Sequence, residues 1–352
     1  MATSKRTGQR QRPVAGAASS SKRKPTRLAA GLSAGFGVML LAGCGLQPAT
    51  SFVPEVQPGT IQAVEGLPED AQITVVSKNF TEQLILGKIA VMTAEAAGFE
   101  VEDFTNVPGS QPVRELMVSG EGDFTYEYTG TAWITYLGNP TGIPDKEEQW
   151  RAVHDADLEN GLTWGRPAPL NNTYAFAVRS EAVPELGNIA KMSQIGDLPV
   201  AERTLCVEAE FNSRPDGLDP MLDTYDIPRG SANGIPDGNI GVYDTGAVYT
   251  ATNDGDCNFG EVFTTDGRID ALDLTVLEDD RKFFPAYNAA PVFNSETLKE
   301  YPQLQEVFDQ VSPLLTDETM RQLNLKVDVE GQEPVDVAHD WMVSEGLITG
   351  ED

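Results

Sequence analysis

The chain has 352 residues and is strongly acidic. Residues 1–43 contain eight Lys or Arg and no Asp or Glu, so residues 44–352 hold 17 basic against 54 acidic side chains, a net charge of −37. A field of that sign repels phosphate backbones, and no basic stripe follows residue 43, so a nucleic-acid partner is not expected. With 40% apolar residues in regular segments, the main body is expected to fold.

The N-terminal segment predicts a lipoprotein signal peptide covering residues 1–43. Basic residues precede an apolar, Gly/Ala-rich run over residues 28–43, and the run ends at Leu41-Ala42-Gly43-Cys44. We expect cleavage before Cys44 and lipid on its thiol, which would anchor the mature chain to the outer face of the cell membrane. The alternative is an uncleaved anchor, but the run is shorter than the roughly 20 residues that a spanning helix needs. Residues 44–71 contain several prolines and predict a flexible tether.

The folded body begins with a predicted strand over residues 73–76, followed by a polar loop and an amphipathic helix that Gly98 ends. Asn79 and Glu82 are spaced like a capping box for that helix. The loop before it carries Lys78 and free backbone amides, a combination that favours anionic groups. Further strands are predicted over residues 99–107 and 123–128, with a short helix between them. Strands that alternate with helices favour a mostly parallel sheet.

A second α/β stretch follows, and helices close the chain. The later predicted strands are residues 174–178, 205–209, 261–264 and 274–277, and the closing helices are 303–315, 316–326 and 335–345. Thr316 is a candidate N-cap of the second closing helix. The sequence therefore predicts two α/β lobes.

The remaining cysteines, Cys206 and Cys257, predict a disulfide. In an exported chain whose Cys44 carries lipid, they form an even pair in a compartment where disulfides persist. Two buried free thiols are the alternative. Neither cysteine lies in a CxxC motif or near a usable histidine, so no metal or redox site is expected there.

Several motifs stand in an order that resembles the glycine betaine/choline-binding proteins of osmoprotectant ABC transporters, over about residues 72–348. The motifs are Ser77-Lys78-Asn79-Phe80-Thr81-Glu82-Gln83, Glu127-Tyr128-Thr129-Gly130-Thr131, Asn171-Asn172-Thr173-Tyr174, Thr265-Asp266-Gly267 and Leu277-Glu278-Asp279-Asp280. The resemblance implies a two-lobed, type II periplasmic-binding-protein-like fold with the ligand cleft between the lobes. Lobe one would comprise residues 72–171 and 289–352, and lobe two residues 172–288. Such a protein closes around a quaternary ammonium compound and delivers it to an ABC permease with its ATPase.

By motif position, the aromatic cage of the family falls on Tyr128, Tyr174, Tyr287 and Phe263. A trimethylammonium head is cationic and has no N–H donor, so ring faces suit it. Phe263 stands where the family leads us to expect tyrosine. Tyr126 stands where proline is common in the family, and it would either bend its strand differently or add a ring to the pocket.

The other end of the ligand, a carboxylate in betaines or a hydroxyl in choline, needs donors. The positions that match the family are Lys78, Thr131 and Arg214. Glu210 would either orient Arg214 or face the cationic head. Because Lys78 and Arg214 come from different lobes, a ligand carboxylate between them would hold the closed form together.

Neither a cofactor, a metal site nor a catalytic group is predicted, since the sequence has no GxGxxG after a strand, no P-loop, no HExxH and no GxSxG. Three alternatives stay open. The same scaffold would suit another compatible solute such as carnitine, proline betaine or ectoine. A surface enzyme acting on choline-like substrates would need a general base in the cleft. A receptor subunit that reports osmolyte level would use the same cleft.

Overall fold

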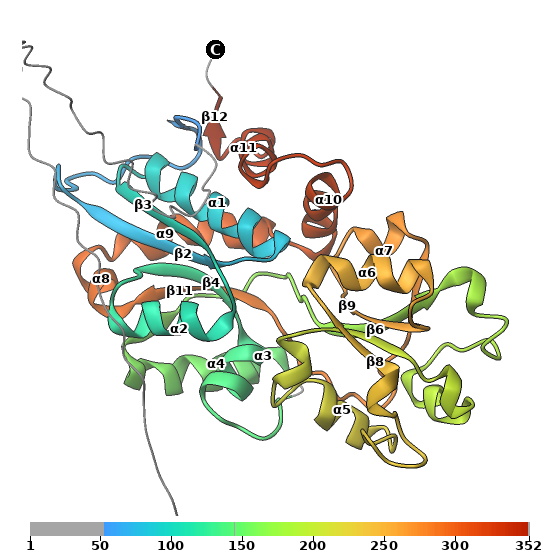
Figure 1. Ribbon diagram of the computed structural model, residues 1–352. Helices are drawn as coiled ribbons and strands as arrows, with labels where there is room; N and C mark the ends of the chain where they lie inside the picture. The colour runs from blue at the N-terminus through green and yellow to red at the C-terminus, as the bar shows by residue number, and fades with distance from the viewer. Residues whose placement is uncertain (1–52, 144, 351–352) are drawn as a thin grey trace, which may run out of the picture. The chain divides into compact units, whose positions relative to one another are not determined.

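The computed structural model describes residues 53–143 and 145–350 (Figure 1). The predicted signal peptide, Cys44 and the first part of the predicted tether lie outside the described residues. None of the helices in the described ranges combines the length and apolar character that a bilayer span requires.

The first lobe is built on a five-stranded sheet in the order β3-β2-β4-β11-β5. Its strands are β2 (Gln72–Lys78), β3 (Glu100–Val107), β4 (Phe124–Tyr128), β5 (Leu162–Trp164) and β11 (Ala289–Asn294). β2 pairs in parallel with β3 and β4, and helices α1 (Thr81–Ala96) and α2 (Ser110–Ser119) make the connections. β11 is antiparallel to both β4 and β5. The prediction of a mostly parallel sheet was wrong here, because β11 returns from the second lobe in the opposite direction.

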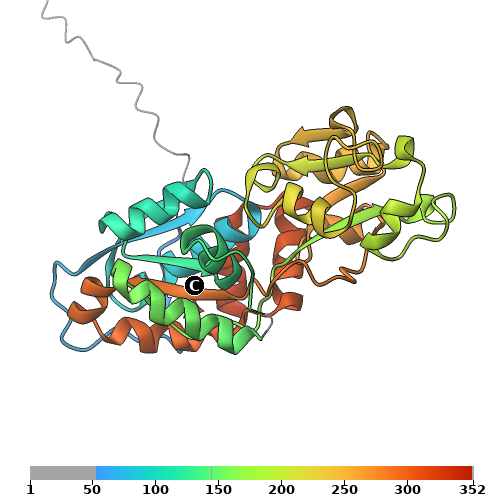
Figure 2. The same ribbon diagram turned by 90° about the horizontal axis from the view of Figure 1, so that it is seen from below.

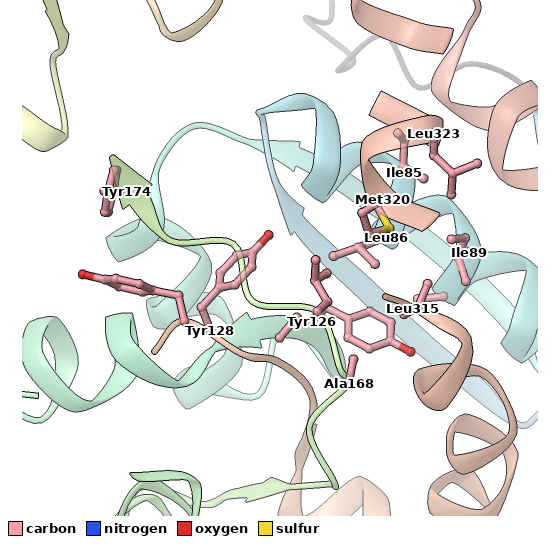
Figure 3. Close-up of a cluster of buried hydrophobic side chains, with 14 of the residues drawn as sticks. Ile85, Leu86, Ile89, Tyr126, Tyr128, Ala168, Tyr174, Leu315, Met320 and Leu323 are labelled. Carbon is pink, nitrogen blue, oxygen red and sulfur yellow. The ribbon is translucent and has the colours of Figure 1, made fainter. Parts of the chain in front are cut away.

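Helix α1 is the central helix of this lobe, and its side chains are buried almost throughout. Ile85, Leu86 and Ile89 are fully buried, and Figure 3 shows them beside Met320 and Leu323 of α10 (Asp317–Asp328). Thr316 caps α10 as predicted, because its hydroxyl accepts a hydrogen bond from Thr319 N. Further helices of this lobe are α3 (Thr129–Thr131), α4 (Lys146–Asp157), α8 (Ser295–Glu300), α9 (Gln303–Val311) and α11 (Pro334–Ser344).

The second lobe has its own five-stranded sheet in the order β10-β6-β9-β7-β8. Its strands are β6 (Tyr174–Arg179), β7 (Leu205–Glu208), β8 (Ile240–Tyr243), β9 (Phe259–Phe263) and β10 (Leu274–Val276). β6 is antiparallel to both neighbours, whereas β7 is parallel to β8 and β9, so this sheet is mixed as well. The helices are α5 (Leu218–Thr224), α6 (Thr245–Asp254) and α7 (Arg268–Ala271). The predicted disulfide is present between Cys206 of β7 and Cys257.

Two chain segments connect the lobes. One runs from β5 to β6 and the other from β10 to β11, and Figure 2 shows that the second sheet uses only the intervening, yellow-green to orange part of the chain. The two segments pair with each other, since Asn171 forms an isolated bridge with Asn288 and Asn172 N donates to Tyr287 O at 3.3 Å. The ligand motif around Tyr174 and the run ending in Tyr287 therefore lie side by side where the lobes join.

The segment that follows residue 57 belongs to the folded body, so the prediction of a tether up to residue 71 was wrong for this part. The short strand β1 (Gln57–Pro58) pairs antiparallel with β12 (Ile348–Thr349), and Ile61 is fully buried. Thr60 N also donates to Gly346 O at 2.8 Å. A strand of two residues is too short to show a periodic pattern, so β1 could not be predicted from the sequence.

Candidate ligand-binding site

A cavity of about 60 Å³ lies where the two lobes meet. A cavity that holds one water molecule has a volume of about 10–15 Å³, so this cavity has room for several heavy atoms. All eight residues predicted for ligand binding line it, namely Lys78, Tyr128, Thr131, Tyr174, Glu210, Arg214, Phe263 and Tyr287. They come from the ends of β2, β4, β6 and β9, from the short helix α3 (Thr129–Thr131) that follows β4, and from the loops that follow β7 and precede β11.

Five aromatic rings gather around this cavity. The Tyr174 ring lies 5.3 Å from that of Phe263 and 5.5 Å from that of Tyr287, to which it is nearly perpendicular. Phe80 completes the set, because its ring stacks on Phe263 at 5.4 Å and on Tyr128 at 6.2 Å. Both lobes contribute rings, so the cluster is complete only when the lobes are together.

Two hydroxyls of this ring cluster donate hydrogen bonds to buried carboxylates. Tyr128 Oη donates to Glu82 Oε1 at 2.7 Å, and Tyr287 Oη donates to Asp216 Oδ2 at 2.7 Å. Burial, together with the Glu82 charge, raises the pKa of Tyr128 well above that of an ordinary phenol. The phenol therefore stays protonated and acts as a hydrogen-bond donor, and the hydrogen bond fixes the ring.

Lys78 and Arg214 already hold carboxylates of the protein itself. Lys78 Nζ lies 2.6 Å from Glu127 Oε1 and 4.9 Å from the centre of the Tyr128 ring. Arg214 makes two hydrogen bonds of 2.7 Å to Asp216, one from Nε and one from an η nitrogen. These internal pairs mean that a ligand carboxylate would share each cation with a resident acid. The expected ligand clamp between Lys78 and Arg214 stays a prediction.

Glu210 contacts both lobes. Its carboxylate accepts from the Arg214 guanidinium at 3.0 Å and from Ser110 Oγ of the first lobe at 2.5 Å. Against burial, which would raise it, the charges of Lys78 and Arg214 hold the pKa of Glu210 below its ordinary value. Of the two roles expected for this residue, the contact with Arg214 is present. Arg214 also reaches the first lobe, because it donates to Thr131 Oγ1 at 3.3 Å.

Glu82 is the residue that the sequence pattern misplaced. The structure begins α1 at Thr81 with Phe80 as N-cap and no side-chain cap, so the expected capping box between Asn79 and Glu82 is not formed. Glu82 instead accepts hydrogen bonds from four side chains, and the residue is 2% exposed. The donors are Tyr128 Oη at 2.7 Å, Asn172 Nδ2 at 3.0 Å, Thr265 Oγ1 at 2.6 Å and Asn324 Nδ2 at 3.4 Å. Burial raises the pKa of Glu82, while these four hydrogen bonds act in the opposite direction.

Tyr126 does not add a ring to the cavity. Its hydroxyl is 3.1 Å from Ser312 Oγ, and its ring packs edge-on against Phe124 and Phe308. Figure 3 shows its ring next to Leu315 and pointing away from Tyr128 and Tyr174. Tyr126 is thus part of the core of the first lobe.

Comparison with known proteins identifies the family. Residues 71–344 match the family described as the substrate binding domain of the ABC-type glycine betaine transport system. The chain belongs to this family. A glycine-betaine-binding protein of Pseudomonas aeruginosa is 35% identical over 291 residues, which cover 80% of this chain and 91% of that protein. The ergothioneine transport permease/ergothioneine binding protein EgtU of Helicobacter pylori is 30% identical over 285 residues, or 79% of this chain and 48% of that protein.

A solved structure shows the same fold. The crystal structure of a glycine betaine/carnitine/choline ABC transporter matches with a TM-score of 0.63 at 24% identity and covers 78% of this chain and 98% of that chain. The two mixed α/β sheets and the cavity between them are those of a type II periplasmic binding protein, as the resemblance implied. In the described ranges, no group of three or more His, Cys, Asp or Glu side chains is arranged to hold a metal ion.

The resemblance to this family predicted eight of the residues that line the cavity. Sequence reasoning missed Phe80, Glu82, Glu127 and Asp216, which support or extend that lining. Phe80 and Glu82 lie inside the first motif, and Glu127 precedes Tyr128 directly, so position in a motif was the available signal. Asp216 lies two residues after Arg214. An Arg and an Asp at that spacing also occur as an exposed ion pair in a loop, so the spacing alone did not mark Asp216 as part of the site.

Proposed function

We propose that this protein is an extracytoplasmic solute-binding lipoprotein of an ABC importer. It captures a quaternary ammonium osmoprotectant, such as glycine betaine or choline, in the aromatic cage and delivers it to a permease that works with an ATPase. The cluster of five rings around a cavity between two lobes is the observation that carries the proposal. Family membership and the names of the relatives support the same class of ligand.

The physical reason lies in the chemistry of a trimethylammonium head. Its methyl groups are apolar, its charge is spread over them, and it offers no N–H donor, so ordinary hydrogen-bonding side chains cannot hold it. An aromatic face contributes about 0.5–2 kcal/mol of cation–π attraction when both partners are desolvated. Several buried rings that face one cavity therefore supply several kcal/mol, which offsets part of the cost of removing the cation from water.

The charges around the cavity support a ligand that carries a positive group. Lys78 and Arg214 are each paired with an acid, and two further carboxylates, those of Glu208 and Glu210, line the cavity. A cationic head adds attraction to these carboxylates. The carboxylate or hydroxyl end of the ligand would be placed toward Thr131 and the two cations, which still offer unused donors.

The remaining parts of the proposal follow from the N-terminal segment. Lipid on Cys44 would anchor the mature protein to the outer face of the cell membrane, and the residues between Cys44 and β1 would serve as the tether. That tether is shorter than the one expected from the sequence, because the chain joins the folded body at Gln57. The anchored protein would act as a carrier without catalysis.

Calorimetric titration of residues 45–352 with glycine betaine, choline, carnitine, proline betaine and ectoine tests the proposal. We expect micromolar binding of one or more quaternary ammonium ligands, and loss of that binding in the Tyr128→Ala/Tyr287→Ala double variant. Tyr243→Ala is the matched control, since Tyr243 lies on β8 and does not line the cavity. If the folded wild-type protein binds none of the quaternary ammonium compounds, the ligand assignment is wrong.

A further inference from the structure

Glu82 is a buried carboxylate that takes part in no ion pair within the described part of the chain. Three other buried carboxylates near the first sheet and the cavity have a cationic partner, namely Glu127 with Lys78, Asp157 with Arg114 and Asp216 with Arg214, whereas Glu261 of β9 is buried without one and accepts one backbone hydrogen bond, from Glu208 N. All four hydrogen bonds to Glu82 come instead from neutral groups. Burial of an unpaired charge costs several kcal/mol, so a resident anion of this kind needs a reason.

The hydrogen bonds fit the ionised form of Glu82. A carboxylate accepts from all four donors at once, whereas a protonated carboxyl would donate its O–H to the hydroxyl of Tyr128 or Thr265 and lose the hydrogen bond that this hydroxyl gives. Asn172 and Asn324 both direct their amide Nδ2 to Glu82, and their Oδ1 atoms lack a hydrogen-bond partner among the described residues. Both amides therefore give their N–H groups to the carboxylate, while their own oxygens have no hydrogen-bond partner among the described residues.

The position of Glu82 links this charge to the cage. Its Oε1 atom accepts the hydrogen bond from Tyr128 Oη, so the carboxylate lies at the far end of a cage ring. Glu82 also lines a small neighbouring cavity that shares Phe80, Asn172 and Phe263 with the ligand cavity. A phenol that donates to an anion gains electron density on its ring face, which strengthens attraction to a cation on that face.

Asp216 accepts a similar hydrogen bond from Tyr287, but it has a cationic partner and Glu82 has none among the described residues. The two oxygens of Asp216 also receive the paired hydrogen bonds of Arg214, which balance its charge. The hydroxyl of Tyr287 therefore contacts an acid whose charge is balanced by Arg214, whereas the hydroxyl of Tyr128 contacts an acid with no cationic partner. The electrostatic potential at the rings is more negative beside Tyr128 for this reason.

We propose that Glu82 is a positioning and specificity-determining residue that makes the cage prefer a positively charged ligand over a neutral ligand of the same shape. It acts through Tyr128 and the local potential, without touching the ligand. Thr265 of the second lobe donates to the same carboxylate at 2.6 Å, so the arrangement is complete when the lobes are together. The inference rests on the proposed function, because it assigns the source of cation selectivity in that same site.

The test compares choline with 3,3-dimethylbutan-1-ol, in which carbon replaces the charged nitrogen. Both dissociation constants are measured on residues 45–352, the alcohol by competition with labelled choline. We expect Glu82→Gln, which keeps an acceptor for Tyr128, to weaken choline binding roughly tenfold and to change binding of the alcohol less than twofold. Glu82→Asp keeps the charge and should retain most of the preference for choline.

Two further variants separate charge from structure. Tyr128→Phe keeps the ring and removes its hydroxyl, so it should lower the preference for choline in the same direction even if Glu82→Gln does not fold. Thr265→Val removes one hydrogen bond and leaves the charge, so it should affect both probes equally. If Glu82→Gln weakens both probes equally or neither, Glu82 is merely structural and the inference is wrong. If wild-type protein binds no choline and no other quaternary ammonium compound, the proposed function fails first.

Discussion

Gly130 offers a direct test of the proposed cage, because it lets the chain approach the Tyr287 ring closely. It lies in α3 (Thr129–Thr131), at the end of the strand that carries Tyr128. A Cβ atom added at Gly130 would lie 2.5 Å from Cδ1 and 2.7 Å from Cε1 of Tyr287, and 2.9 Å from Ala286 O. The substitution Gly130→Ala therefore forces the Tyr287 ring away from its position.

The expected magnitude follows from those distances. Ordinary carbon contacts begin near 3.4 Å, so the ring must shift by about 1 Å, and the backbone oxygen of Ala286 leaves little room to share the movement. Extra atoms in a packed site cost about 1–3 kcal/mol. A displaced ring also forfeits part of its cation–π attraction, about 0.5–2 kcal/mol. The overpacking cost falls on folding and the lost attraction falls on binding, so we expect the dissociation constant of glycine betaine to rise roughly 2- to 30-fold.

Calorimetric titration with glycine betaine measures this change. Gly238→Ala is the control, since a Cβ atom at Gly238 would meet nothing within 4 Å. That variant should bind as the wild type does. If Gly130→Ala is folded and binds glycine betaine within twofold of the wild type, the Tyr287 ring is not a wall of the ligand site and the reasoning is refuted.

Three further predictions concern stability. Replacing Cys206 and Cys257 by serine should lower the free energy of unfolding by about 4 kcal/mol, as expected for a closed loop with a sequence separation of 51, and leave ligand affinity unchanged. Urea unfolding measures this, and a loss below about 1 kcal/mol would contradict it. Burial and the nearby Asp103 charge raise the pKa of Glu95 to about 7, so the native state keeps a proton that the unfolded chain releases near pH 4.5. Stability should therefore fall as pH rises from about 4.5 to 7, and Glu95→Gln should remove about 1 kcal/mol of that fall, after allowance for partial exposure. Melting temperatures at pH 5 and pH 8 test this, and an equal difference between variant and wild type at both values argues against it. Tyr126→Phe should cost about 1 kcal/mol of stability through the lost bond to Ser312 and leave the ligand affinity within twofold, and a larger loss of affinity would place Tyr126 in the site.

The sequence predicted the lining of the site better than its internal electrostatics. Tyr128, Tyr174 and Tyr287 could be placed because each stands in an ordered motif, and the structure brings them to one cavity. The pairing of Lys78 with Glu127 could not be predicted, because it joins strands that are 49 residues apart. Glu82 was assigned to a capping box because its spacing from Asn79 fits one, whereas tertiary hydrogen bonds decide its actual role.

The limits for the fold are similar. Strands such as β2 and β6 are long, apolar and rich in β-branched or aromatic residues. The predicted bounds of β6 lie within one residue of those observed, and those of β2 within two. β5 and β8 have three and four residues, and β11 contains Pro291, so neither length nor composition marked them as strands. Their places are set by pairing with neighbours that are distant in the sequence.

The proposed function requires a quaternary ammonium head to lie among the five rings of the cavity. Co-crystallisation with tetramethylammonium is the sharpest test, because this probe is the head group alone and does not depend on which tail the natural ligand carries. We expect density for the ion in contact with the rings of Phe80, Tyr128, Tyr174, Phe263 and Tyr287. Density for the ion elsewhere, with the ring cluster in place, would contradict it.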